Sequence, residues 1–208
     1  MENKLTFNKE THEYFFNGTK FPSVTHILQD AGIIDLSGIP FSRLEAAREF
    51  GSAVHLACQL YDEDNLNEKT LDHNFRPYLD AWVKFEKDTG FEIIEFEEDT
   101  GFVIIENENP ICSPKYRFAG TPDRVGRLDC LTIVDIKSTA ELSPAIGIQT
   151  AGYQIAWNET HEEKVKKRIA VLLQPDGKYK IESYKDKNDT NVFLAALSVF
   201  NWKKRNLK

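Results

Sequence analysis

The fold of this chain is decided by residues 118–153, FAGTPDRVGRLDCLTIVDIKSTAELSPAIGIQTAGY. Its middle part, Leu131 to Lys137, is apolar at positions that point to both faces of an extended strand, which is typical of a strand in the centre of a sheet. A turn is expected near Asp129, so the segment before it and the central strand form a hairpin. Ser143-Pro144 is a favourable pair for starting a helix, and a helix is expected after it.

Two aspartates bracket the expected turn symmetrically. Asp123 and Asp135 each lie six residues from Asp129, so a simple hairpin sets them directly opposite each other. Opposed like charges destabilise a sheet unless something offsets their repulsion. A shared divalent cation would do so, and oxygen ligands favour a hard ion such as Mg²⁺ or Mn²⁺. The alternative is a wide turn with a shifted register, which leaves both carboxylates in water.

Three further side chains belong near these carboxylates. Lys137 follows Asp135 by two positions, so both side chains point to the same face of the strand. An acid and a base that emerge together from a buried strand are costly unless they are paired or used in chemistry. The alternative is an ordinary surface pair at the strand end. Gln149 and Tyr153 are four residues apart on the expected helix and share one of its faces.

Hydrophobic periodicity and turn residues predict the other elements. In chain order they are a hairpin over residues 5–21 with a turn at Asn17-Gly18, a helix from Pro22-Ser23 to Gly32, helices over 43–63 and 75–89, a strand–turn–strand over 91–105 around Gly101, a hairpin over 166–184 around Gly177, and a helix capped by Asp189 or Thr190. The inner stripe of the 43–63 helix is expected to include Leu44, Ala47, Val54, Ala57, Cys58 and Tyr61. This order of elements indicates an α/β architecture with a mixed central sheet flanked by helices.

The composition is that of a globular protein, with 41% hydrophobic residues in a chain of 208. We expect a single domain over residues 1–208, in which residues 1–90 form a hairpin and helical part and residues 91–208 form the core and a basic hairpin–helix. No apolar run could span a membrane and the start does not resemble a signal peptide, so a soluble, cytoplasmic protein is expected. Three distant cysteines argue against disulfides, a structural zinc or an iron–sulfur cluster.

The net charge of −7 is unevenly distributed along the chain. Residues 1–160 carry 14 lysines and arginines against 27 acidic residues, whereas residues 161–208 carry 12 against 6. If the partner is a polyanion, the basic C-terminal part is the more natural contact surface. The simpler interpretation is that most of the excess acids keep the surface soluble.

Taken together, the residues resemble the PD-(D/E)XK nuclease superfamily, in particular its RecB-like exonuclease branch. That branch includes phage and prophage nucleases and the mitochondrial genome maintenance exonuclease. The resemblance rests on these segments: Pro122-Asp123, Asp135-Ile136-Lys137, Gln149-x-x-x-Tyr153, the upstream Gly51-x-x-x-His55, Pro22-Ser23-Val24-Thr25 and Gly120-Thr121. Without the resemblance, His55 would be interpreted as a packed or surface histidine.

The resemblance implies a restriction-endonuclease-like core and a role for each of these residues. The implied ligands of one or two Mg²⁺ or Mn²⁺ ions are His55, Asp123, Asp135 and the backbone carbonyl of Ile136. Lys137 would position the attacking water or stabilise charge on the phosphate, and Gln149 and Tyr153 would orient Lys137 or grip a flanking phosphate. Glu108 falls near a glutamate often present in the family. Candidate contacts to the DNA backbone are Arg124, Arg127, Lys164, Lys166 and Lys167.

The expected function is therefore that of a Mg²⁺- or Mn²⁺-dependent deoxyribonuclease. The resemblance favours an exonuclease that acts on single-stranded DNA or DNA ends, in phage recombination or DNA repair, with a recombination or replication protein as a partner. Two alternatives stay open: a nucleic-acid-binding protein that kept the fold without catalysis, and a restriction-type endonuclease. The second of these would favour a dimer and sequence-reading elements.

Overall fold

The N-terminal segment forms a small three-stranded antiparallel sheet. The computed structural model describes residues 4–93, 96–97, 103–104 and 109–207, and begins with β1 (Leu5–Asn8), β2 (Glu13–Phe16) and β3 (Thr19–Phe21). Asn17 and Gly18 have φ values of 48° and 75°, as the tight turn of an Asn-Gly hairpin requires. The predicted hairpin is therefore confirmed, and a further strand makes it a three-stranded sheet.

Three helices follow, close to their predicted bounds. They are α1 (Val24–Asp30), α2 (Phe41–Asp62) and α3 (Arg76–Thr89). The Ser23 hydroxyl caps α1 by accepting a hydrogen bond from the His26 backbone N–H at 3.1 Å. Only the C-terminal half of α2 packs in the core: Val54 is buried, whereas Ala47 is exposed. The predicted inner stripe is therefore wrong for the first turns of α2.

The main sheet has five strands in the order β12-β11-β10-β9-β4. Their bounds are β4 (Glu92–Ile93), β9 (Arg124–Arg127), β10 (Leu131–Lys137), β11 (Lys167–Leu173) and β12 (Tyr179–Ser183). β10 pairs parallel with β11 and antiparallel with β9, and the other pairs are antiparallel. The mixed sheet and the central position of β10 are thus as the sequence predicts. β10 and β11 are joined by α4 (Ala145–Thr160), the crossover that a parallel pair needs.

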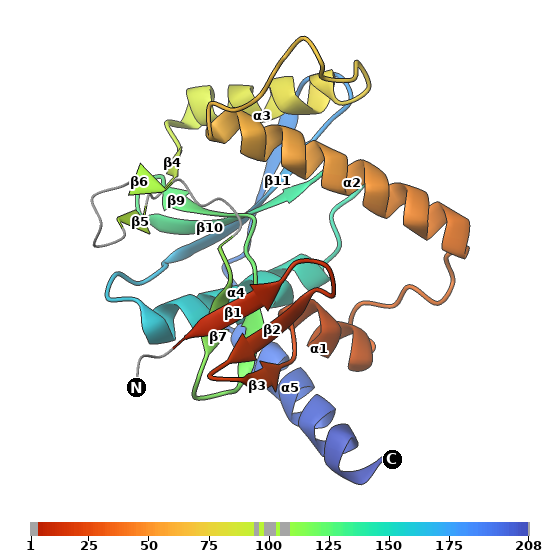
Figure 1. The fold of residues 1–208 in the computed structure, drawn as a ribbon, viewed down its shortest axis with the longest axis vertical. Coiled ribbons are helices and arrows are strands. Elements are labelled where there is room, and N and C mark those ends of the chain that lie inside the picture. Colours follow the sequence, from red (N-terminus) through yellow and green to blue (C-terminus); the bar gives the residue numbers. More distant parts are fainter. Residues whose placement is uncertain (1–3, 94–95, 98–102, 105–108, 208) are drawn as a thin grey trace.

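Helices cover both faces of this sheet (Figure 1). Val134 and Ile136 of β10 pack with α2 and α3, whereas Leu131 and Ile133 pack with α1, α4 and α5 (Asn188–Asn206). Because side chains alternate along a strand, Asp135 and Lys137 fall on the face that carries α4. α5 begins at Asn188 rather than after a cap at Asp189 or Thr190, and no side chain caps it.

The remaining strands form two short pairs. β5 (Phe96–Glu97) pairs with β6 (Val103–Ile104), and β7 (Ile111–Ser113) pairs with β8 (Phe118–Gly120). The predicted strand–turn–strand over 91–105 thus divides: β4 joins the main sheet through β9, and the turn residue Gly101 lies outside the described residues. None of the described helices is long and apolar enough to cross a membrane.

Candidate active site

The register of the central hairpin brings the two aspartates together. Val134 lies opposite Arg124, so the same register continued by one residue sets Asp135 opposite Asp123. This is the pairing that a turn centred at Asp129 predicts. The alternative of a wide turn with a shifted register is therefore wrong.

Each carboxylate is held by its own partners. Oδ2 of Asp123 accepts a hydrogen bond from the backbone N–H of Ile136 at 2.7 Å, and its Oδ1 lies 3.4 Å from Nδ1 of His55. Oδ2 of Asp135 lies 2.5 Å from Nζ of Lys137. One cationic or potentially cationic group thus faces each aspartate, and this arrangement offsets the repulsion between the two like charges.

The electrostatics of the two aspartates differ. Burial would raise the pKa of Asp123, but the charges of His55 and Lys137 and a backbone N–H hold it well below its usual range. For Asp135 burial prevails over Lys137 and raises the pKa to about 6. Burial would lower the pKa of Lys137, but the two carboxylates raise it overall. Lys137 is therefore a cation here, which suits charge stabilisation better than proton abstraction.

His55 reaches the aspartates from α2, where that helix passes the end of β10. A Cβ atom placed on Gly51 would lie 3.9 Å from Oγ of Ser138, the residue that follows β10. The His55 side chain is 21% exposed. Burial would lower its pKa, but the Asp123 carboxylate outweighs this and raises it. A helix and a hairpin far apart in the sequence thus supply one cluster.

The donor atoms at this end of the hairpin are of the kind that binds a hard divalent cation. Oδ2 of Asp135 is buried and lies 2.5 Å from the Lys137 ammonium, so its charge is paired, but it accepts no further hydrogen bond in the part of the chain that the structure describes. A carboxylate oxygen left in this state, with a second carboxylate opposite, fits Mg²⁺ or Mn²⁺ by donor type. The described residues contain no group of three His, Cys, Asp or Glu side chains already gathered for a metal. A cation would therefore draw these donors closer together.

α4 contributes Gln149 and Tyr153 as a pair. Nε2 of Gln149 donates a hydrogen bond to the Tyr153 hydroxyl at 3.0 Å. The ring of Tyr153 lies so close to β8 that a Cβ atom on Gly120 would come within 2.6 Å of it, so this position requires glycine. Among the described residues, neither side chain forms a hydrogen bond to Lys137. Gln149 orients the phenol of Tyr153 instead.

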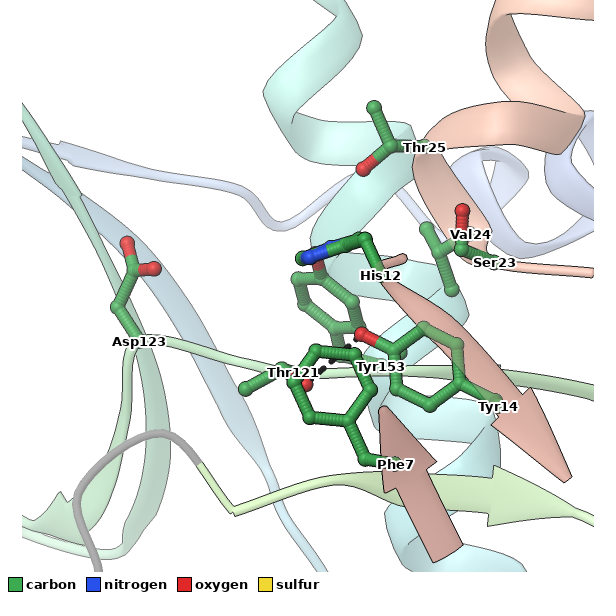
Figure 2. A pocket seen from close by; sticks show the side chains of 10 residues that line it. Phe7, His12, Tyr14, Ser23, Val24, Thr25, Thr121, Asp123 and Tyr153 are labelled. Carbon is green, nitrogen blue, oxygen red and sulfur yellow. Dashed lines mark hydrogen bonds between the residues drawn. The ribbon is translucent and has the colours of Figure 1, made fainter. Parts of the chain in front are cut away.

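A pocket of about 240 Å³ opens beside Asp123 (Figure 2). It is lined by Phe7, His12, Tyr14, Ser23, Val24, Thr25, Gly120, Thr121, Asp123 and Tyr153. The hydroxyls of Tyr14 and Thr121 are 2.9 Å apart and hydrogen-bonded, which ties the N-terminal sheet to the loop that carries Asp123. A second hollow, of about 300 Å³, lies along α2 and includes His55 in its lining. His55 and Asp123, which are in contact, therefore line two different pockets.

The basic residues expected to contact DNA do not lie beside the carboxylates. Arg124 is wrong for that role, because it is 1% exposed and its Nε donates at 2.7 Å to a fully buried Asp62. The other four lie around the turn end of the hairpin: Arg127 pairs with Glu163, Lys167 pairs with Asp129, Lys164 donates to the carbonyls of Asn158 and His161, and the Lys166 backbone N–H donates to Leu131. Lys167 lies opposite Thr132, roughly 17 Å along the strand from Lys137. Glu108 lies outside the described residues.

The aromatic side chains that the N-terminal sheet contributes to the pocket are the part of the site that the sequence did not reveal. Phe7, His12 and Tyr14 alternate as in any half-buried strand pair, and this pattern predicted only a hairpin. Nothing in their spacing indicates that they lie near Asp123. The one available signal, an N-terminal segment unusually rich in aromatic residues, is as typical of a core as of a binding surface.

Comparisons with known proteins give a family and weak structural likenesses. No curated protein matches the sequence. Among solved structures, the chain is similar to a candidate exonuclease from Eubacterium rectale, at 10% identity and a TM-score of 0.47 over 76% of this chain and 69% of that one. It is also similar to an alkaline exonuclease from Laribacter hongkongensis, at 14% identity and a TM-score of 0.38 over 88% of this chain and 91% of that one. Structural similarity at such TM-scores does not indicate a shared activity.

The family match covers most of the chain. The sequence model of the PD-(D/E)XK nuclease superfamily matches residues 31–198, which include α2 with His55, the central hairpin and α4. The mixed sheet flanked by helices agrees with the restriction-endonuclease-like fold that the resemblance implied. The chain therefore belongs to the PD-(D/E)XK nuclease superfamily.

Proposed function

We propose that this protein is a metal-dependent deoxyribonuclease, acting as an exonuclease on single-stranded DNA or DNA ends. One observation carries the proposal: Asp123 and Asp135 face each other at the end of a buried hairpin, with Lys137 beside them. Two opposed carboxylates, one buried and the other largely shielded from water, are costly, and a purely structural role would not favour them. Membership of a nuclease superfamily supports hydrolysis of phosphodiester bonds.

The residues that would hold Mg²⁺ or Mn²⁺ are His55, Asp123, Asp135 and the backbone carbonyl of Ile136. When bound, such an ion lowers the pKa of a bound water and neutralises charge on the scissile phosphate. The Ile136 N–H, which donates to Asp123 at 2.7 Å, fixes the orientation of that carboxylate.

Lys137 acts as a fixed positive charge beside the scissile phosphate. Its Nζ donates to the Ile136 carbonyl at 3.3 Å and lies 2.5 Å from Asp135, which confines the ammonium to the end of β10. There it positions the attacking water and stabilises the negative charge that develops on the phosphate. Tyr153 assists from α4: because its hydroxyl accepts from Gln149, its own proton stays free to donate to a flanking phosphate.

The biological setting is proposed from the resemblance alone. The RecB-like branch supports a role in phage recombination or DNA repair, together with a recombination or replication protein. The basic residues near the turn end of the hairpin, Arg127, Lys164, Lys166 and Lys167, remain candidates for contacts to DNA that extends away from the site.

The test is degradation of end-labelled linear single strands, linear duplexes and single-stranded circles with Mg²⁺, Mn²⁺ or EDTA. We expect linear strands or ends to be degraded with the metals and nothing to be degraded in EDTA. Lys137→Ala should abolish the activity without changing the far-ultraviolet circular dichroism spectrum. Cleavage of circles would point to an endonuclease, and binding without any cleavage would point to a non-catalytic nucleic-acid-binding protein.

A further inference from the structure

Apart from the Tyr153 hydroxyl, whose proton is proposed to reach a flanking phosphate, the pocket beside Asp123 has a lining that does not suit a phosphate. None of its ten lining residues is lysine or arginine, and the one carboxylate among them, Asp123, is a proposed metal ligand that offers a phosphate no positive charge of its own. The remaining lining is aromatic, aliphatic or hydroxylic. Such a surface suits an uncharged, planar group that can accept or donate hydrogen bonds at its edge.

The aromatic wall of the pocket is held in place before any ligand arrives. The rings of Phe7 and Tyr14 are stacked, with centroids 4.6 Å apart and planes 23° apart, and the His12 ring meets Phe7 edge-on at 5.1 Å. Tyr14 is buried and anchored to Thr121, whereas Phe7 is half-buried and His12 is exposed. Phe7 and His12 are thus the ring surfaces that a ligand can reach.

The position of this wall relative to the scissile bond follows from the chain. Thr121, to which the wall is anchored, precedes Asp123 by two residues, and Figure 2 shows the Asp123 carboxylate on the opposite side of the pocket from Tyr14. His12, in the turn between β1 and β2, has a φ of 53°, which is the left-handed conformation, and its side chain lines the pocket. A group held in this pocket is therefore adjacent to Asp123, one of the two proposed catalytic carboxylates.

We infer that this pocket binds one nucleobase of the DNA strand, the base next to the scissile phosphate, against the ring surfaces of Phe7 and His12. The inference rests on the proposed nuclease function and adds a substrate subsite to it. At about 240 Å³, the pocket is smaller than the roughly 300–1,000 Å³ typical of small-molecule sites, so it takes one base and excludes a base pair. The base must therefore be unpaired, which selects single strands or frayed ends. Stacking on aromatic rings is tolerant of sequence, so no base preference is expected.

The test measures binding of fluorescein-labelled oligo(dT) in EDTA, where the proposed metal-dependent cleavage cannot occur. An abasic nucleotide is stepped from one end of the oligonucleotide to the other. At one position it should weaken binding to the wild-type protein by about 5- to 150-fold, the range for loss of one stacked base. Phe7→Leu keeps an apolar side chain but removes the ring, so it should weaken binding of the intact strand similarly. The affinity of Phe7→Leu should also not depend on where the abasic nucleotide is placed, because the substitution and the missing base remove the same contact.

Phe15→Leu is the matched control. Phe15 lies on the opposite face of β2 from Tyr14, is half-buried and does not line the pocket, so its replacement should leave binding unchanged. Equal losses for the two variants, or an abasic effect that persists in Phe7→Leu, would overturn the nucleobase subsite while leaving the nuclease proposal intact. A wild-type protein that neither binds nor degrades DNA would overturn both.

Discussion

The hairpin of β9 and β10 carries acid–base pairs at both of its ends, and the two ends differ in exposure. At the turn end, the side chains of Arg127 and Glu163 are 49% and 54% exposed. At the opposite end, Asp135 is 3% exposed and Lys137 is 24% exposed. Exposed pairs contribute about 0–1 kcal/mol because water competes for both partners, whereas buried charges remain strong and demand compensation. Acid–base pairs are therefore part of a solvated surface at one end and of a candidate reaction centre at the other.

The largest expected effect is a loss of DNA cleavage that occurs for a substitution at the buried end of the hairpin and not at the exposed end. Asp123→Asn keeps the size of the side chain and its acceptor for the Ile136 N–H but removes the negative charge. We expect DNA cleavage to fall by on the order of 10³-fold, because a carboxylate that would hold the metal ion is lost, and with it the charge neutralisation that the ion would supply at the phosphate. Asp129→Asn, at the exposed turn of the same hairpin, should leave cleavage unchanged. Single-turnover rates on labelled single strands measure both, and equal losses would remove the functional distinction between the ends.

The next largest effect concerns stability and the buried arginine of β9. Arg124→Ala leaves the Asp62 carboxylate without its partner in a position where both side chains are 0% exposed. Loss of one member of such a pair typically costs about 3–5 kcal/mol. The Trp82 indole N–H still donates to Asp62 at 2.7 Å, so the lower part of this range is expected. Urea unfolding measures the change; a loss below about 1 kcal/mol would show that Asp62 readily finds other partners or water.

The contrast between the ends was only partly predictable from the sequence. The symmetry of Asp123 and Asp135 about Asp129 predicts their pairing because hairpin register is a local property. The central strand and the face shared by Gln149 and Tyr153 follow from periodicity in the same way. Each of these inferences uses residues close together in the sequence.

Exposure and long-range contacts were not predictable in this way. Arg124 was expected to face DNA, yet it is buried because Asp62, 62 residues earlier, is positioned by α2 to neutralise it. The pocket beside Asp123 depends on a contact between Tyr14 and Thr121 that spans 107 residues. No local pattern encodes such contacts, since they arise only when the N-terminal sheet packs against β8. His55 was found through the family resemblance and not through its own spacing.

The stability of the protein should also depend on pH, through a carboxyl group on α3. Burial, reinforced by Asp62, raises the pKa of Glu86 on α3 to about 8, far above the value of an unfolded glutamate. Between these two values the folded state holds a proton that the unfolded state releases, so stability falls as the pH rises toward 8. Glu86→Gln removes this contribution. Because Glu86 is only partly buried, solvent screening reduces this contribution to about 1 kcal/mol, so we expect the loss of melting temperature between pH 5 and 8.5 to be about 2–4 °C smaller in the variant than in the wild type. Identical pH profiles would mean that Glu86 is solvated in the folded protein.

The smallest effect is expected at the exposed end, and it makes the comparison with Arg124 direct because both arginines lie on β9. Arg127 donates two hydrogen bonds to Glu163, at 2.8 Å each, in an arrangement that looks strong by geometry alone. With both side chains about half exposed, Arg127→Ala should nevertheless cost less than about 1 kcal/mol in urea unfolding. The cost should shrink further in 1 M salt, which screens surface charges, whereas the cost of Arg124→Ala should not. If Arg127→Ala were as costly as Arg124→Ala, exposure would not be what distinguishes the two ends of the hairpin.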